Sequence, residues 1–355
     1  MRWSVPKRLW FDKVVCWQRE HGRSGLPWQH THDPYRVWLS EIMLQQTQVA
    51  TVLDYYPRFL HAFPTVQALA AAPPNQVMAL WSGLGYYSRA RHLHACAQAV
   101  VYEHGGQFPA SAVALQALPG IGPSTAAAIA AFCFGERVSI LDGNVKRVLS
   151  RHWGLEHDVT TSAGHKVLWP LAQAQLPAQP SHADMVAYTQ GLMDLGATVC
   201  KPRQPLCGAC PAQSTCVALA SGDPARLPLK MKRMVRRAED WWLQVCVRAD
   251  GAVWLTKRPS KGVWADLYAF EQQADEAAAL LPPKGVMRNA EPQMHLTVKH
   301  VLTHKDLMLH MVQWPVTDAF DAGDGGLWLH PLDDDSQVGL PAPLRTWLRE
   351  VLWAA

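Results

Sequence analysis

Apolar and polar positions alternate along the first 220 residues with the spacing of short helices. Between Trp38 and Tyr56 the chain has neither glycine nor proline, and apolar side chains such as Leu39, Ile42 and Met43 recur at helical intervals. Glycine and proline punctuate the rest of this region as often as short helices require. Further helices are predicted over residues 112–118, 124–134, 145–152 and 183–195. This pattern predicts an all-α domain over residues 1–221.

The pattern changes beyond residue 221. Residues 222–240 hold six basic side chains with little apolar periodicity, which is typical of a solvated linker; a linker that contacts phosphates is the alternative. Residues 241–259 then predict two strands joined by a turn at Asp250-Gly251, and residues 293–314 predict more strands. We therefore expect a multi-domain chain in which this linker joins the all-α domain to an α+β domain over residues 241–355.

Composition narrows the class of protein. The 355 residues are 49% hydrophobic and 17% charged, which argues against disorder, and at roughly 100–200 residues per domain the length fits two or three domains. No apolar run approaches the roughly 18 residues of a membrane-spanning helix, and the N-terminus lacks the pattern of a secretory signal. The net charge of +4 is compatible with a nucleic-acid partner without requiring one. We expect a cytoplasmic protein without a membrane partner.

Four of the eight cysteines fall within 17 residues, in the order Cys200-x6-Cys207-x2-Cys210-x5-Cys216. Four thiolates in one short segment form the ligand set of a tetrahedral zinc ion or of a [4Fe–4S] cluster. Zinc ribbons usually pair two C-x2-C knuckles, whereas only one pair has that spacing here, and the wider pattern suits a bulkier group. Four unrelated buried cysteines are the alternative, which such close clustering disfavours. With four protein ligands, either group has no open position for catalysis.

Residues 118–126, LPGIGPSTA, join two apolar helical stretches through a glycine-rich turn. Gly120 and Gly122 allow a tight turn, and the helix that follows presents unpaired N–H groups that suit a phosphate. An ordinary turn between helices is the alternative. Further along, Asp142 follows the apolar Ile140 and Leu141 and opens a predicted helix, where capping is the ordinary role of an aspartate.

The order of these motifs is similar to that of the helix-hairpin-helix DNA glycosylases, whose endonuclease III-type members carry the same cysteine pattern in an iron–sulfur loop. Residues 40–49, SEIMLQQTQV, closely resemble the corresponding segment of MutY-type adenine DNA glycosylases. The resemblance covers nearly the whole chain. It implies a helix-hairpin-helix domain with the hairpin at 112–134 and a [4Fe–4S] loop at 200–216. It also implies a monomeric enzyme that removes adenine mispaired with 8-oxoguanine or guanine in double-stranded DNA.

The resemblance also implies the catalytic residues. Glu41 protonates the adenine, which requires a carboxylic acid with a pKa raised by burial, and Asp142 stabilises positive charge on the sugar. Asn144 holds Asp142 in place; whether Asp142 also bonds covalently to the sugar stays open. Bifunctional relatives carry a nucleophilic lysine where this chain has Ser124, so we expect a monofunctional enzyme in which Ser124 assists the water or the sugar. Lys146 is expected to contact a phosphate or an ion-pair partner.

Binding residues follow from the same resemblance. The adenine pocket is expected to be lined by Trp28, Gln29, Leu44, Val49 and Gln190. Gln46 is expected to lie beside the oxidised guanine. Residues 81–91, WSGLGYYSRAR, match the family's minor-groove probe, in which Leu84 and Tyr86 enter the base stack. Tyr86 and Tyr87 as ordinary core aromatics are the alternative.

Residues 241–355 resemble the Nudix-like C-terminal domain of the family, which recognises 8-oxoguanine through a Phe-Ser-His motif. Here the corresponding run is Val301-Leu302-Thr303-His304, so Thr303 and His304 are expected to contact the lesion while Leu302 lacks the aromatic ring. The REUxEExGU helix of metal-dependent Nudix hydrolases is absent from the sequence. Two other hypotheses remain open: a thymine- or uracil-mismatch glycosylase or lyase, and a non-enzymatic iron–sulfur module that binds lesions or senses redox state.

Overall fold

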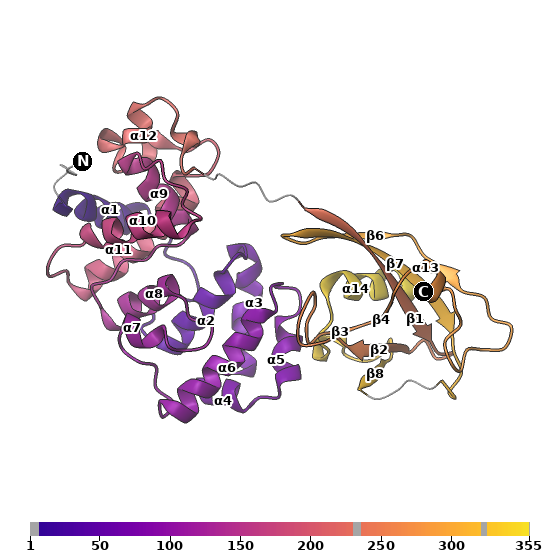
Figure 1. Cartoon of the computed structure of the whole chain (residues 1–355). Helices are drawn as coiled ribbons and strands as arrows, with labels where there is room; N and C mark the ends of the chain where they lie inside the picture. The colour runs from indigo at the N-terminus through magenta and orange to yellow at the C-terminus, as the bar shows by residue number, and fades with distance from the viewer. Residues whose placement is uncertain (1–6, 230–235, 321–324, 355) are drawn as a thin grey trace. The chain divides into compact units, whose positions relative to one another are not determined.

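The computed structural model describes residues 7–229, 236–320 and 325–354 (Figure 1). The chain divides into two compact units, the first spanning Met1–Ala71 and His92–Arg233, the second Ala72–Arg91 and Met234–Ala355. Among the described residues, no helix is long and apolar enough to cross a membrane.

The first unit is helical. Its longer helices are α1 (Lys7–His21), α2 (Pro34–Leu44), α3 (Val49–Ala62), α8 (Pro123–Phe134), α9 (Gly143–Trp153), α10 (Ser162–Ala174) and α11 (His182–Asp194). Shorter helices are α4 (Val66–Ala71), α7 (Ala112–Leu115), η1 (Leu195–Val199), η2 (Cys207–Ala209), η3 (Gln213–Thr215), α12 (Val217–Ala220) and η4 (Pro224–Arg226). Helix α6 (Ser88–Glu103) begins in the second unit and ends in the first. The predicted all-α character is therefore confirmed over the described part of this unit.

One predicted helix is wrong in its extent. The continuous helix expected from Trp38 to Tyr56 is divided, because α2 ends at Leu44 and α3 begins at Val49. Within the break, Gln46 adopts a left-handed backbone with φ of 57°, a conformation that ends helical hydrogen bonding. The polar run Gln45–Gln48 has no apolar side chain to bury, so packing does not hold these residues in a helix.

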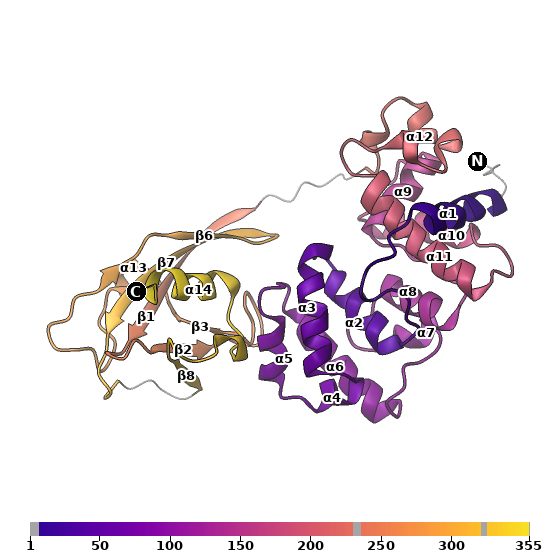
Figure 2. The ribbon, with the colours of Figure 1, turned by 180° about the vertical axis from the view of Figure 1, so that it is seen from behind.

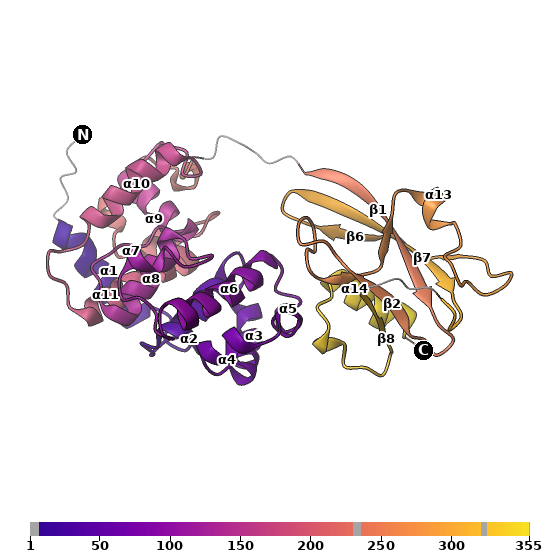
Figure 3. The same ribbon diagram turned by 60° about the horizontal axis from the view of Figure 1, so that its bottom comes forward.

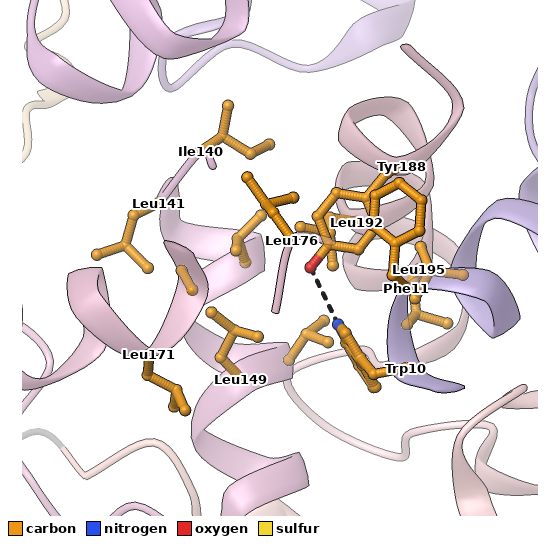
Figure 4. Packing of buried hydrophobic residues seen from close by; sticks show 14 of the residues in the cluster. Trp10, Phe11, Ile140, Leu141, Leu149, Leu171, Leu176, Tyr188, Leu192 and Leu195 are labelled. Carbon is orange, nitrogen blue, oxygen red and sulfur yellow. Dashed lines mark hydrogen bonds between the residues drawn. The ribbon is translucent and has the colours of Figure 1, made fainter. Parts of the chain in front are cut away.

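A continuous apolar core joins helices α1, α8, α9, α10 and α11 of the first unit (Figure 4). Helix α1 lies along α11, as Figure 3 shows, and Trp10 Nε1 donates a hydrogen bond of 3.0 Å to the Tyr188 hydroxyl. The Phe11 ring stacks on Tyr188 with the ring centroids 4.6 Å apart. Ile140 and Leu141, which precede Asp142, are buried in the same core. This packing fixes the start of α9 relative to α1 and α11.

The second unit contains a mixed sheet. Its strands are β1 (Arg237–Val247), β2 (Val253–Lys257), β3 (Tyr268–Ala269), β4 (Glu271–Gln273), β5 (Gln293–Met294), β6 (Val298–Val301), β7 (Lys305–Pro315) and β8 (Gly326–Leu329). The order β3-β2-β1-β7-β5 places the long parallel pair β1–β7 at the centre, with Trp242 opposite His310. Strand β4 pairs with β1, β6 with β7 and β8 with β2. The predicted turn at Asp250-Gly251 is confirmed, since Gly251 has φ of 83° between β1 and β2.

Helices complete the second unit. They are α5 (Pro74–Trp81), α13 (Glu276–Ala279), η5 (Asp335–Gln337), α14 (Ala342–Trp347) and η6 (Leu348–Leu352). Helix α14 lies beside the sheet, with the Trp347 ring edge-on to Phe270 at a centroid distance of 5.5 Å (Figures 1 and 2). Segment 72–91 joins this unit in part through the Ser82 hydroxyl, which donates a 2.5 Å hydrogen bond to the Leu340 carbonyl.

Two features differ from the domain division expected above. Strand β1 begins at Arg237, so the last residues of the expected linker 222–240 pair with β7 instead of being solvated coil. Residues 72–91 belong by their contacts to the second unit although they lie within the expected helical domain. Three of the six basic linker side chains, Lys230, Lys232 and Arg233, lie outside the described residues.

Candidate active site

A cavity of about 740 Å³ opens in the first unit. Its walls come from helices α1, α2, α3, α8, α9, α11 and η1 and from the loop before α2. Eight residues predicted from the sequence line it together: Trp28, Gln29, Glu41, Leu44, Val49, Asp142, Asn144 and Gln190. Its size is typical of a small-molecule site.

Glu41 lines the cavity from α2. The side chains Trp38, Leu39 and Met43 on the same helix are completely buried, and Glu41 itself is partly buried where it lines the cavity. Burial raises the pKa of Glu41 to about 8, and the negative charge of Asp142 adds to the rise. At neutral pH this carboxyl group therefore carries a proton that it can donate.

Asp142 is the N-cap of α9. Its Oδ1 accepts the Val145 N–H at 2.7 Å, so the capping role expected for an aspartate is present. Burial raises the pKa of Asp142, while the Val145 and Asn144 N–H groups and the charge of Arg147 oppose that rise. Burial thus raises the pKa of both carboxyl groups, but donors and cations oppose the rise at Asp142, whereas a like charge adds to it at Glu41.

The side chains of Asn144 and Lys146, which follow Asp142 in the sequence, form their hydrogen bonds with residues other than Asp142. Asn144 Oδ1 accepts a hydrogen bond of 2.8 Å from Arg147, and Arg147 also donates to the Gly196 and Cys200 carbonyls. The contribution of Asn144 to Asp142 comes from its backbone N–H. Lys146 Nζ lies 2.6 Å from His165 Nε2, and the charge of Asp142 also acts on it.

Ser124 and the two hairpin glycines, Gly120 and Gly122, lie in the segment that precedes Asp142 in the sequence. The Ser124 hydroxyl accepts the Leu141 N–H at 3.1 Å, which ties the start of α8 to the segment before Asp142. Gly120 has φ of 74°, and a Cβ there would lie 2.5 Å from His92 Cβ. Gly122 is the N-cap of α8 and has open space where a Cβ would stand. The first N–H groups of α8 are thus accessible at the hairpin.

Sequence reasoning missed the polar network that supports the cavity. Asp194, completely buried at the end of α11, accepts hydrogen bonds from Gln190 Nε2 at 2.8 Å and from the Arg23 backbone and guanidinium. His32 and His182 also line the cavity, and each has a ring nitrogen within 3.0 Å of the Phe132 carbonyl. The available signal was the four-residue spacing of Gln190 and Asp194 on one helix, which places them on one face.

A second cavity, of about 420 Å³, lies within the second unit. The turn that contains Tyr86 and the turn at residues 302–304 line it, together with Trp264 and His300, which sequence reasoning missed. The Tyr86 hydroxyl and Thr303 Oγ1 are 2.6 Å apart. Tyr86 is 43% exposed, whereas Leu84 is only 6% exposed and packs inside the unit. Of the two residues expected in the probe, Tyr86 is exposed and Leu84 is buried; their role in the base stack stays a prediction.

The four clustered cysteines line one small apolar void of about 30 Å³ in the first unit, and none forms a disulfide. Arg151, only 2% exposed, lies against them: its guanidinium is 3.4 Å from Cys200 Sγ. The same guanidinium donates to the carbonyls of Lys201, Pro202 and Leu227. Four cysteines that line one void beside a buried cation have the chemistry of a thiolate ligand set, although within the described ranges no three or more such side chains lie close enough together to hold a single metal ion.

Comparisons with known proteins agree with this architecture. Residues 39–172 match the HhH-GPD superfamily of base excision DNA repair proteins, and residues 243–350 match the NUDIX domain family. The adenine DNA glycosylase of Buchnera aphidicola subsp. Baizongia pistaciae is 32% identical over 95% of this chain and 95% of its own. The adenine DNA glycosylase of Mus musculus is 46% identical over 90% of this chain and 73% of its own.

Solved structures match the helical part. A thermostable thymine-DNA glycosylase superposes with a TM-score of 0.55 and 28% identity, covering 61% of this chain and 97% of its own. Endonuclease III in a non-covalent DNA complex gives a TM-score of 0.50 over 61% of this chain and 98% of its own; at 19% identity it supports the fold alone. The expected fold class is confirmed. The chain belongs to the MutY-type adenine DNA glycosylase family and is a DNA N-glycosylase.

Proposed function

We propose that this enzyme removes adenine mispaired with 8-oxoguanine, or with guanine, by hydrolysis of the N-glycosidic bond and without cutting the strand. The observation that carries the proposal is a pair of carboxyl groups in one cavity, of which Asp142 has hydrogen-bond donors and cations facing it while Glu41 has burial and a like charge. Base excision of this kind needs one acid and one anion at the same nucleotide.

Glu41 supplies the acid. Adenine is a poor leaving group until a ring nitrogen is protonated, and a carboxyl group with a pKa of about 8 still holds its proton at neutral pH. Protonation at N7 lets the electrons of the C1′–N9 bond move into the base. Adenine then departs as a neutral molecule.

Asp142 supplies the anion. As the C1′–N9 bond breaks, positive charge develops on the sugar, and the carboxylate stabilises it. The Val145 N–H bond holds Asp142 Oδ1 in one orientation, so little reorganisation is needed when the charge forms. Water then adds to C1′ and completes the hydrolysis.

The residues near Asp142 support hydrolysis without strand cleavage. Ser124 cannot form an imine, and its hydroxyl already accepts the Leu141 N–H. Lys146 is outside the set of residues that line the cavity, and its Nζ contacts His165. Recognition of the base opposite adenine is proposed for the second cavity, where the Tyr86–Thr303 hydroxyl pair offers a donor and acceptors.

Single-turnover release of adenine from 8-oxoG·A and G·A duplexes tests the proposal. We expect release from both, with alkali-dependent strand breaks, and excision of T from a T·G duplex but not of A would contradict it. Glu41→Gln and Asp142→Asn are each expected to lower the rate of release at least about 100-fold while duplex binding persists. Retained excision in both variants would refute the two roles and favour a binding module.

We also infer a [4Fe–4S] cluster held by Cys200, Cys207, Cys210 and Cys216. The four thiols share one apolar void beside Arg151, whose positive charge suits a set of thiolates. When bound, the cluster would brace the loop between α11 and α12. Purified protein should contain about four iron and four sulfide per chain by elemental and colorimetric analysis. Stoichiometric zinc without sulfide would contradict the inference.

A further inference from the structure

A turn at residues 83–87 lines part of the second cavity, and Ser82 stands directly before it at the end of α5. The Ser82 hydroxyl donates to the Leu340 carbonyl at 2.5 Å. The neighbouring Gly339 carbonyl accepts the N–H of Tyr268, which lies in β3, at 2.8 Å. Ser82 therefore connects this turn to the sheet of the second unit through a short segment of chain.

Arg345, in α14, fixes the direction of the Ser82 hydroxyl bond. Its Nη2 lies 3.2 Å from Ser82 Oγ and donates to it, because a guanidinium has donors and no acceptor. The hydroxyl accepts from Arg345 and places its own hydrogen on the Leu340 carbonyl. The same Nη2 donates to the Val338 carbonyl at 2.8 Å. One guanidinium therefore holds both the Ser82 hydroxyl and the chain segment to which that hydroxyl binds.

Asp335 holds Arg345 in this position. Arg345 Nη1 donates to the Asp335 carbonyl at 2.6 Å and lies 2.8 Å from Asp335 Oδ1. Arg349 donates to Oδ2 of the same carboxylate from Nε at 2.8 Å, and the Arg349 side chain is 58% exposed. The Asp335 side chain is only 7% exposed, so its charge requires such donors. A buried ion pair adds little to net stability, and its strict geometry suits a positioning role.

The turn is held at its other end as well. Arg91 Nη1 donates to the Ala265 carbonyl at 3.0 Å, and both residues line the second cavity. Between the two ends, the Tyr86 hydroxyl lies 2.6 Å from Thr303 Oγ1. Hydrogen bonds between hydroxyl groups span about 2.5–3.0 Å, so a small shift of the turn would break this contact.

We propose that Arg345 and Asp335 are positioning residues, which hold the turn at residues 83–87 in place and thereby set the preference for 8-oxoguanine over guanine opposite adenine. This inference rests on the proposed function, in which the second cavity recognises the base opposite adenine. Arg345 and Asp335 are both outside the set of described residues that line this cavity. They act on the opposite base through Ser82 and the turn that follows it.

The test measures single-turnover adenine release from 8-oxoG·A and G·A duplexes, and its readout is the ratio of the two rates. Ser82→Ala removes the hydroxyl that Arg345 holds and leaves the buried Asp335–Arg345 pair intact. We expect the ratio to fall about 5-fold, with the larger loss on 8-oxoG·A. Ser82→Thr is the matched control, because it keeps the hydroxyl, and it should keep the ratio within about 2-fold of wild type.

Arg345→Met and Arg349→Met form a second matched pair. Each removes a guanidinium from the Asp335 carboxylate, but it is Arg345 that also contacts Ser82. Arg345→Met should lower the ratio about 5-fold. Arg349→Met should lower the melting temperature and leave the ratio within about 2-fold of wild type. If Arg345→Met is unfolded by circular dichroism, the comparison of Ser82→Ala with Ser82→Thr decides the question.

Ser82→Ala combined with Tyr86→Phe tests whether the network acts through the turn. Once the Tyr86 hydroxyl has been removed, Ser82→Ala should lower the ratio no further. Additive losses in this double variant would overturn the inference. Equal losses on both duplexes in Ser82→Ala would also overturn it, since they would show that the network is only structural.

The failure of this inference can be told apart from the failure of the proposed function. A wild-type enzyme that releases no adenine from either duplex overturns both together. A wild-type enzyme that prefers 8-oxoG·A, with the same ratio in Ser82→Ala, overturns this inference alone.

Discussion

At the scale of single residues, two similar carboxyl groups lie in different surroundings. Asp142 receives N–H groups at a helix start, where the helix dipole also favours a negative charge. Glu41 has buried apolar neighbours on its own helix and a like charge nearby. The first set of contacts favours a charged carboxylate and the second opposes one, which is the basis of the two roles proposed above.

We expect the rate of adenine release to fall as the pH rises through about 8, because only protonated Glu41 acts as the acid. Single-turnover rates between pH 6 and 9.5 would measure this basic limb. Glu41→Gln should lower the rate at least about 100-fold and remove the limb. A rate independent of pH across this range would contradict the assignment of Glu41.

The same pKa makes stability depend on pH. The pKa of Glu41 rises from its ordinary 4.5 to about 8 on folding, so between these values the folded state holds a proton that the unfolded state has lost. Stability from this group is present below 4.5 and is lost as the pH rises to 8. Glu41→Gln should therefore raise the melting temperature more at pH 8 than at pH 5. Equal shifts at both pH values would be inconsistent with a buried acid.

Asp142 has two tasks that substitutions can separate. Asn keeps the N-cap but not the charge, so Asp142→Asn should lose activity by about 100-fold or more with little change in unfolding free energy. Ala removes both, and Asp142→Ala should cost about 1 kcal/mol of stability in addition. Thermal unfolding and adenine release on both variants check this difference. If Asn destabilises as much as Ala, the cap at Asp142 is not the relevant contact.

The residues that could be predicted from sequence are those whose chemistry lies in one short segment. Glu41 is recognisable within residues 40–49, and Asp142 follows an apolar run that opens a helix. Asp194 could not be predicted in the same way. Its hydrogen bonds to Arg23 span 171 residues, and a contact at that distance in the chain has no local signal.

At the scale of elements, apolar spacing in the sequence predicted where the helices occur. The residues at which helices end depended on the backbone conformation of single residues. The break between α2 and α3 rests on Gln46 with φ of 57°, which no periodicity reveals in a run without glycine or proline. The hairpin before α8 was easier to predict from the sequence. Its positive φ falls on Gly120, and glycine is the residue that adopts a positive φ most readily.

The two hairpin glycines offer a matched pair of substitutions. Gly120→Ala forces a Cβ into a left-handed residue 2.5 Å from His92 Cβ, and should cost about 1–3 kcal/mol of unfolding free energy. Gly122→Ala has open space and an ordinary φ of −81°, and should cost less than about 1 kcal/mol. Both should weaken duplex binding, since each places a methyl group near the N–H groups of α8. Equal stability of the two variants by chemical denaturation would contradict the steric argument.

At the scale of the whole molecule, each compact unit has a cavity of its own. The second cavity combines turns that lie more than 200 residues apart in the sequence, since Tyr86 and Thr303 are separated by 217 residues. Sequence motifs identified both turns but not their contact. Leu302 stands where the family motif has an aromatic residue. The second cavity is present despite this difference, and Trp264 and His300 also line it.

The Tyr86–Thr303 pair should act as a unit in choosing the base opposite adenine. We expect Tyr86→Phe and Thr303→Val each to lower the preference for 8-oxoG·A over G·A about 5-fold, by removing one hydroxyl of the pair. The double variant should lower it no further. Single-turnover rates on the two duplexes measure this coupling, and additive losses would show that the hydroxyls act separately.

Arg151 affects which substitutions the cysteine loop, residues 200–216, can tolerate. Its guanidinium holds the start of the cysteine loop through the carbonyls of Lys201 and Pro202, and main-chain carbonyls are the same whatever side chain a residue carries. The side chains of residues 201–204 are exposed. Substitutions of these exposed side chains are therefore expected to leave the hydrogen bonds of Arg151 intact. Arg151→Lys should lose most of them, because the single ammonium nitrogen of lysine cannot span the carbonyls that the guanidinium reaches from three separate nitrogens.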